Sequence, residues 1–288
     1  MTFRSILSPI SGTESDAAVL NAALHVARTF NGHIDALHIE RELHDLPIRR
    51  AAGYEMARAY EAARLVEEET ETRRSSAQTQ FEDFLKASEI KMYDTPSPRQ
   101  SPSASWSVER GLEPAVVTEQ GLTHDLIVVS HPNAANGHDA RETIEAALFG
   151  TGRPVLITPP KTFDKIGETV MIGWNRTIQS ARAVAAAMPF LETARRVVVC
   201  MVTTGAKQGP SPQDLARTLA WNNINAEVKE VAPDKRKVGE ILLAEAEAID
   251  ADLLVMGAYS HSRLREMILG GVTRHVLDHA EIPLLMTH

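Results

Sequence analysis

Short apolar runs separated by longer amphipathic segments recur along the whole chain. The runs DLIVVS and DLLVMG are apolar at nearly every position, which is typical of strands buried on both faces of a parallel sheet. Because helical patterns alternate with such runs, the sequence predicts doubly wound parallel sheets with right-handed crossovers. The expected strands lie near residues 4–10, 33–39, 104–109, 125–130, 154–158, 169–174, 195–202, 225–231, 252–257 and 283–287.

The chain contains an internal repeat. RSILSPISGTESDAAVLNAAL matches ETVMIGWNRTIQSARAVAAAM at a constant offset of 164 residues, so that Leu7 falls on Met171. Further along, HDLIVVS matches ADLLVMG at an offset of 127, and GRPVLIT matches EIPLLMT at 129. Self-similarity of this kind indicates two copies of one unit. We therefore expect two domains, 1–160 and 161–288, connected through the linker-like stretch PPKTFDKIGE.

The first copy carries an insertion, because the offset falls by 37 residues between the first two matches. The charged stretch 41–90 accounts for the extra residues. It is rich in helix formers around the acidic run EEETETRR, which predicts a long helix with a solvated face. A helix present in only one copy is also the natural surface for a protein partner.

A glycine-bearing loop follows the fourth expected strand of the second copy. Gly257 ends the strand, and Gly270 and Gly271 open the next amphipathic segment, where unpaired helix N–H groups favour an anion. The segment resembles the nucleotide loop of the universal stress protein family, whose pattern is Gly, two residues, Gly, nine residues, Gly, then Ser or Thr. The spacing is intact, but Ser260 replaces a glycine and Gly271 replaces the hydroxyl residue, with Thr273 two positions later.

The resemblance implies a fold and a ligand. The fold is adenine nucleotide alpha-hydrolase-like, with two tandem five-stranded parallel sheets of strand order 3-2-1-4-5. The implied pairing of the last strands, 154–158 and 283–287, would make a pseudo-dimer within the chain. Association of two whole chains into a homodimer stays open beside it. The implied ligand is ATP or another adenine nucleotide, with Mg as an accompanying ion.

The resemblance also assigns residues to the nucleotide. In the family the first strand usually ends in an aspartate that meets the ribose or base, and Asn175 holds that position here. An ordinary turn residue is an equally good interpretation of Asn175. Val202, at the end of the second strand, would line the adenine pocket. The residues expected to surround the phosphates are Gly257, Ser260, Gly270, Gly271, Val272 and Thr273.

The first copy departs from the pattern at each of these places. Ser11 stands where the second copy has Asn175, and Ser130 replaces the strand-end glycine. Aligning the closing strands puts Arg141 and Glu142 on the two loop glycines. A carboxylate at a helix N-terminus would satisfy the dipole and repel a phosphate. We therefore expect the first copy to be structural or an interaction module, and ATP to occupy only the second half.

Composition limits the function further. The formal net charge of −8 argues against nucleic acid as a partner. No apolar run reaches about 18 residues, so neither a membrane span nor a signal peptide is expected. A single cysteine, Cys200, excludes an intrachain disulfide, and together these features favour the cytoplasm. Cys200 lies in the run VVVCMV and is interpreted as a buried core thiol.

The chain offers no constellation for catalysis or metal binding. His275 and His279 have the spacing of helical zinc ligands, but Val276 stands where a metallohydrolase needs glutamate. No G-x-S-x-G or G-x-x-x-x-G-K-[ST] motif is present. The resemblance implies a stress-response regulator that binds an adenine nucleotide, and the absence of a catalytic base argues against turnover. Two alternatives stay open: a scaffold that binds no nucleotide and acts through its inserted helix, and a slow ATP hydrolase.

Overall fold

The computed structural model describes residues 2–40, 54–93, 95, 102–132, 137–203, 209–258 and 271–288, with only the backbone for 54–60, 62–63 and 137–139. In the first half the elements are β1 (Ser5–Ile10), α1 (Asp16–Phe30), β2 (His33–Glu40), α2 (Tyr54–Ser88), β3 (Lys91–Met92), β4 (Ser103–Arg110), α3 (Glu113–Gly121), β5 (Leu126–Ser130), α4 (Gly137–Gly150) and β6 (Val155–Thr158). In the second half they are β7 (Thr169–Gly173), α5 (Ile178–Thr193), β8 (Arg196–Val202), α6 (Pro212–Ala220), β9 (Ala226–Val231), α7 (Val238–Ala248), β10 (Leu253–Gly257), α8 (Gly271–His279) and β11 (Leu284–Thr287).

All ten expected strands are present, each within one residue of its predicted bounds. The sheet order is β3-β4-β2-β1-β5-β6-β11-β10-β7-β8-β9. Each half therefore has its own five strands in the order 3-2-1-4-5, as predicted, and pairing within each half is parallel. The two-residue strand β3, which the sequence did not predict, extends the first half at its outer edge.

The two halves are joined through their last strands. β6 and β11 pair antiparallel, with Leu156 opposite Leu285 and Ile157 opposite Leu284. All four side chains are fully buried. The pairing predicted between 154–158 and 283–287 is confirmed, and it protects two apolar edges that would otherwise be open to another chain.

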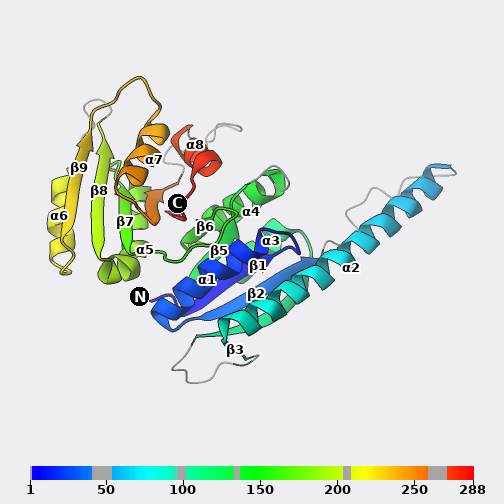
Figure 1. Cartoon of the computed structure of the whole chain (residues 1–288). Coiled ribbons are helices and arrows are strands. Elements are labelled where there is room, and N and C mark those ends of the chain that lie inside the picture. Colours follow the sequence, from blue (N-terminus) through cyan, green and yellow to red (C-terminus); the bar gives the residue numbers. More distant parts are fainter. Residues whose placement is uncertain are drawn as a thin grey trace.

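Helices cover both faces of this continuous sheet (Figure 1). Buried side chains of α1, α2, α5 and α6 form the core on one face, and those of α3, α4, α7 and α8 form the core on the other. The first core crosses between the halves, because Phe190 of α5 packs against Phe3 and Phe30 with ring centroids 5.3 and 5.2 Å apart. Each half thus buries part of the other.

The predicted helix in the insertion is confirmed as α2, which has 35 residues. Towards its C-terminal end, Ala77 and Phe81 are buried on the sheet, whereas Leu65 remains 56% exposed. Figure 1 shows the N-terminal part of α2 extending beyond the rest of the first half. Residues 41–53 of the expected insertion lie outside the described residues. None of the helices in the described part of the chain combines the length and apolar character that a membrane crossing requires.

Candidate functional site

The carboxyl ends of β7 and β10 form the topological switch point of the second half. These strands are neighbours in the sheet, with Gly173 beside Met256, although the chain leaves them toward opposite edges. Open α/β sheets bind ligands beyond such strand ends, because the connections diverge there and leave a crevice. Both predicted residues lie at this edge: Asn175 follows the end of β7, and Gly257 is the last residue of β10.

Asn175 closes a turn between β7 and α5. Its Oδ1 accepts hydrogen bonds from the hydroxyl and the backbone N–H of Thr177, at 2.6 and 3.3 Å. Thr177 in turn caps α5 through a reciprocal capping box with Ser180. The acceptor that was expected to meet a ribose is therefore used within the turn, and the amide nitrogen is the part of Asn175 that could meet a ligand.

Gly257 has a packing role at the end of β10. A Cβ at this position would lie 2.5 Å from the backbone carbon of Gln179 and the backbone nitrogen of Ser180. Only glycine lets the first turn of α5 approach the strand this closely. Gly257 therefore brings the N-terminus of α5 over the switch point, whether or not it also contacts a ligand.

The described part of the phosphate loop is the start of α8. Gly271 is the first helical residue and is exposed, and a Cβ on it would meet no described atom within 4 Å. Val272 is half-buried and Thr273 is buried. Backbone N–H groups in the first turn of a helix lack intrahelical partners, so this end of α8 suits an anion.

The remaining predicted residues are placed as follows. Val202 is the last residue of β8 and is half-buried, next to the switch strand β7 in the sheet. Ser260 and Gly270 lie outside the described residues. The structure thus brings Asn175, Val202 and Gly257 to one edge of the sheet.

Cys200 is fully buried, and burial raises the pKa of its thiol to about 11. The interpretation as a buried core thiol is confirmed. His275 and His279 stack with ring centroids 4.1 Å apart, and Nδ1 of His279 contacts the carbonyl of His275. Within the described ranges, no group of three or more His, Cys, Asp or Glu side chains could hold a metal ion.

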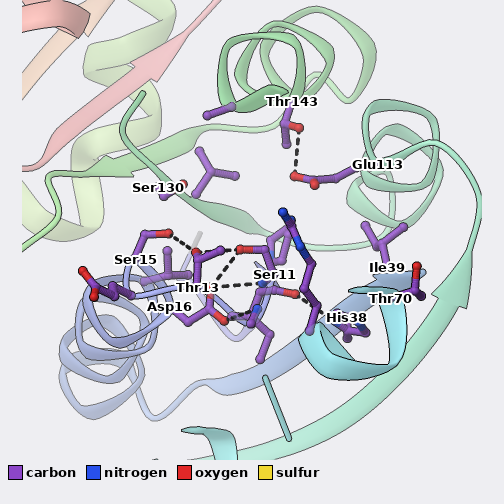
Figure 2. A pocket seen from close by; sticks show the side chains of 18 of the residues that line it. Ser11, Thr13, Ser15, Asp16, His38, Ile39, Thr70, Glu113, Ser130 and Thr143 are labelled. Carbon is purple, nitrogen blue, oxygen red and sulfur yellow. Dashed lines mark hydrogen bonds between the residues drawn. The ribbon is translucent and has the colours of Figure 1, made fainter. Parts of the chain in front are cut away.

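The first half contains a cavity of about 540 Å³ at the corresponding edge of its strands. Figure 2 shows Ser11, Thr13, Ser15 and Asp16, from the turn after β1, on one side and Glu113 and Thr143 on the other. Val66, Glu69, Thr70 and Arg73 of α2 also line it. Sequence reasoning missed this cavity, because the polar run SGTESD directly after the first strand marks one of its walls but not the helix that covers it.

Asp16 organises the turn beneath this cavity. It is 1% exposed and accepts hydrogen bonds from the backbone N–H groups of Ser11 and Gly12, at 3.0 and 2.7 Å. Burial raises the pKa of the Asp16 carboxyl, and the hydrogen bonds from Ser11 and Gly12 oppose this shift. Two N–H donors of this turn, those of Ser11 and Gly12, are therefore occupied by the protein's own carboxylate.

Comparison with known proteins relates the C-terminal part of the chain to a protein family. Residues 205–288 match the model of the universal stress protein family. These 84 of the 288 residues are similar to the universal stress protein family. A comparison with curated protein sequences finds no match.

Solved structures of universal stress proteins share the fold over the whole chain. One from Archaeoglobus fulgidus DSM 4304 superposes with a TM-score of 0.67 at 14% identity, over 98% of this chain and 97% of its own. A putative universal stress protein from Pseudomonas aeruginosa UCBPP-PA14 gives 0.53 at 17% identity, over 99% and 93% of the two chains. The first half therefore has the universal stress protein fold although the family model does not reach it.

One expectation about the first half is wrong. Glu142 does not lie at a helix N-terminus, because α4 begins at Gly137 and Glu142 is its sixth residue. Counting back from the closing strands therefore places Arg141 and Glu142 at the fifth and sixth residues of α4, inside the helix. Arg141 instead forms an ion pair with Asp278 of α8 and thereby links the two halves.

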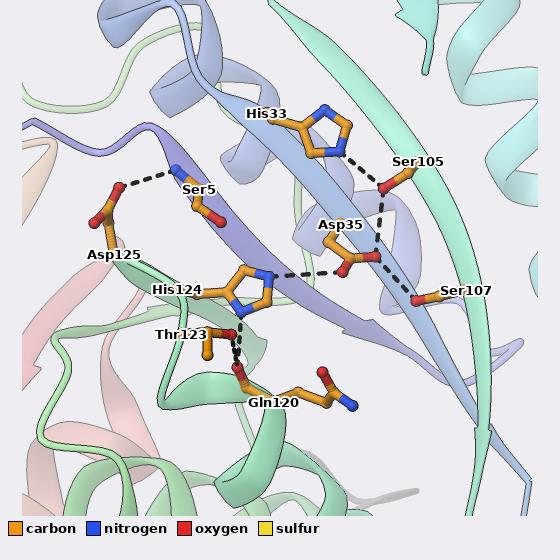
Figure 3. A network of polar contacts seen from close by, with 9 residues as sticks. All are labelled: Ser5, His33, Asp35, Ser105, Ser107, Gln120, Thr123, His124 and Asp125. Carbon is orange, nitrogen blue, oxygen red and sulfur yellow. Dashed lines mark hydrogen bonds and ion pairs between the residues drawn. The ribbon is translucent and has the colours of Figure 1, made fainter. Parts of the chain in front are cut away.

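A separate polar network lies at the opposite end of the first-half strands (Figure 3). Asp35 of β2 accepts a hydrogen bond from Ser107 at 2.9 Å and faces Nε2 of His124 at 3.6 Å. Burial by itself would raise the pKa of Asp35, but the bonds from His124 and Ser107 lower it overall. Burial would lower the pKa of His124, but Asp35 and the Gln120 carbonyl raise it. This pair is remote from both strand-end sites and is a stabilising contact.

Proposed function

We propose that this chain is a tandem universal stress protein that regulates a stress response by binding ATP or a related adenine nucleotide in its second half, residues 161–288. The observation that carries the proposal is the family match over 205–288, because this segment contains the loop that resembles the family's nucleotide loop. The resemblance supplies the adenine nucleotide as ligand, and the local geometry supports the position.

Three features of the second half support that position. The site lies at the switch point between β7 and β10, where doubly wound sheets bind ligands. α8 begins there with Gly271, whose exposed backbone leaves room for a phosphate close to the first-turn N–H groups. The second-half turn is closed by the uncharged Asn175 and Thr177, so the described residues put no carboxylate in that turn.

We propose that the first half does not bind the nucleotide. The sequence suggested that Glu142 would repel a phosphate, but the carboxylate among the N–H groups of the turn after β1 is that of Asp16. A phosphate there would displace a buried carboxylate from its donors or lie beside its charge. We therefore expect one adenine nucleotide per chain.

The direct test is titration calorimetry of the full chain with ATP, with and without Mg²⁺, together with native mass spectrometry of the complex. One site per chain is the expected result. Two equivalent sites would contradict the asymmetry between the halves. No heat and no bound mass at millimolar ATP would refute nucleotide binding and favour a scaffold that acts through α2. A phosphate-release assay on the same samples separates binding from slow hydrolysis.

A further inference from the structure

The outer edge of the second-half sheet is formed by β9. This strand is the last one in the sheet order, and no strand among the described residues pairs with its outer side. Figure 1 shows β9 as the outermost strand of the second half. The corresponding strand of the first half, β4, has β3 as its outer neighbour, with Lys91 opposite Ser103. The first half therefore covers part of an edge that the described second half leaves open.

The even-numbered residues of β9 present their backbone groups at this edge. The Thr203 N–H donates to the Val231 carbonyl at 2.9 Å, so the backbone of Val231 faces β8. Because backbone groups of successive residues in a strand point to opposite sides, the N–H and C=O groups of Ala226, Val228 and Glu230 point outward. The strand contains no proline that would remove a donor. An edge of this kind can accept a further strand.

Two opposite charges lie on one face of β9. Glu227 and Lys229 are two residues apart, so their side chains point to the same side of the sheet. Glu227 accepts two hydrogen bonds of 2.8 Å from Arg196 of β8, and Lys229 forms an ion pair with Glu245 of α7. Both side chains are held in position by these contacts, yet they remain 57% and 39% exposed. The edge therefore offers one negative and one positive group in a fixed arrangement.

A second copy of β9 matches this arrangement in one antiparallel register. A two-fold axis perpendicular to the sheet pairs the strand antiparallel with itself and places residues of the same face opposite each other. An axis at Glu227, Lys229 or Glu230 would put two like charges directly opposite, which is destabilising. An axis at Val228 instead puts Glu227 of each copy opposite Lys229 of the other.

The same register also satisfies the backbone. It places Val228 opposite Val228 and Ala226 opposite Glu230, and these are the residues whose backbone groups point outward, so each pair can exchange two hydrogen bonds. Glu227 and Lys229 then occupy the pairs without hydrogen bonds between them, in which opposing side chains are closest.

The charges then form a row on each side of the axis. Arg196 and Glu227 of one copy are followed by Lys229 and Glu245 of the other, so that the sign alternates from each group to the next. A network of this kind is a stronger contact than an isolated surface ion pair.

We propose that the β9 edge is a homodimer interface, in which two chains join antiparallel about an axis at Val228. The occupant is a second copy of this chain because the edge carries both members of the charge pair and is therefore complementary to itself. A lysine on an edge strand commonly discourages pairing with another chain. Here Lys229 meets Glu227 of the second copy. The interface is separate from the pairing of β6 with β11 within the chain.

The test is sedimentation velocity of the full chain at concentrations between about 10 and 500 μM, a range suited to a small interface. A monomer–dimer equilibrium is expected. Lys229→Glu and Glu227→Lys each place like charges opposite each other on both sides of the axis, and each should weaken its own dimer at least about tenfold. An equimolar mixture of the two variants should restore a dimer, because one chain carries only negative and the other only positive charge at these positions.

Glu192→Lys on α5 is the matched control, because it makes the same charge change as Glu227→Lys at an exposed position away from β9. It should leave the dimer unchanged. Circular dichroism checks that each variant is folded. If a variant of reversed charge does not fold, Lys229→Gln replaces it, and this neutral change should weaken the dimer about fivefold.

Three results would overturn the proposal. The first is a native chain that stays monomeric up to about 500 μM. The second is a dimer that the changes at Glu227 and Lys229 leave unaffected, which would mean that another surface forms it. The third is a pair of folded, monomeric variants whose mixture does not restore the dimer. Because no nucleotide is present in these experiments, their outcome is independent of nucleotide binding by the second half.

Discussion

Replacing Gly271 by aspartate should stabilise the protein while weakening nucleotide binding. Gly271 is the first residue of α8, is exposed, and has room for a Cβ among the described atoms. Glycine is about 1 kcal/mol less favourable than alanine in a helix, and aspartate lies between the two. A carboxylate in the first turn adds about 0.3–1 kcal/mol through the helix dipole. The free energy of unfolding should therefore rise by roughly 0.5–1 kcal/mol, about 1–3 °C in Tm.

The same carboxylate would face the phosphates of a nucleotide bound at this end of α8. Two unit charges about 4 Å apart repel by about 4 kcal/mol at an effective dielectric constant of about 20, a factor of roughly a thousand in Kd. Because Gly271 is exposed, solvent and salt reduce this repulsion, and we expect at least about a tenfold loss of ATP affinity. The two effects have opposite signs, so a loss of binding cannot be attributed to unfolding.

Asparagine at the same position is the matched control. Gly271→Asn has nearly the same shape as Gly271→Asp but no charge, so it should bind ATP several-fold more tightly than the aspartate variant. Calorimetric Kd and thermal unfolding of both variants, at low and at high salt, give the comparison. Equal affinities in the two variants would refute the placement of the phosphates at the start of α8, because the charge would then be irrelevant.

Three further predictions concern other parts of the molecule. Gly257→Ala should lower the free energy of unfolding by about 1–3 kcal/mol in thermal or urea unfolding, because its Cβ would lie 2.5 Å from the first turn of α5, whereas Gly271→Ala should not. Ser260→Gly should tighten ATP binding roughly tenfold in calorimetry if the loop needs a left-handed residue there, and unchanged affinity would contradict this. His124→Gln should cost about 0.5–1 kcal/mol near pH 5.5, where His124 and Asp35 are both charged. The pKa of His124 is raised above 6.5 and that of Asp35 is lowered below 3.8. The stability difference between the wild type and His124→Gln should therefore fade as the pH rises through the folded-state pKa of His124, and also as the pH falls through that of Asp35. A constant difference from about pH 5.5 to pH 9 would contradict an ion pair between His124 and Asp35.

The strands could be predicted from the sequence because parallel strands buried on both faces leave a continuous apolar run. LIVVS, the sequence of β5, has four fully or nearly buried apolar residues in succession, and the flanking polar residues mark its ends. The pairing of β6 with β11 followed from the resemblance and from the need to cover two apolar edges. The strands depend on local composition, so the internal repeat was enough to align those of the first half with those of the second.

The first-half cavity could not be predicted, because it depends on where α2 lies. Gly12 and Arg73 are far apart in the sequence, and nothing in either segment specifies that the helix rests on the turn. The solvated face expected in the insertion is present, since Glu67, Glu68 and Glu71 are exposed. The sequence pattern did not predict that Phe81 packs in the core and thereby places α2 over the strand ends. Contacts between an inserted element and its host are set by tertiary packing, which a repeat-based alignment does not contain.

The difference between the halves is concentrated at one aligned position. At the offset of 164 residues, Asp16 falls on Ser180, and both side chains accept hydrogen bonds from backbone N–H groups of the turn after the first strand. The geometry is shared, but the first half closes its turn with a carboxylate and the second with a hydroxyl. A buried carboxylate makes that end of the first sheet repel anions and attract cations, whereas the neutral hydroxyl leaves the turn of the second half without such a charge. The difference between Asp16 and Ser180 therefore gives a physical basis for a nucleotide to bind in the second copy and not in the first.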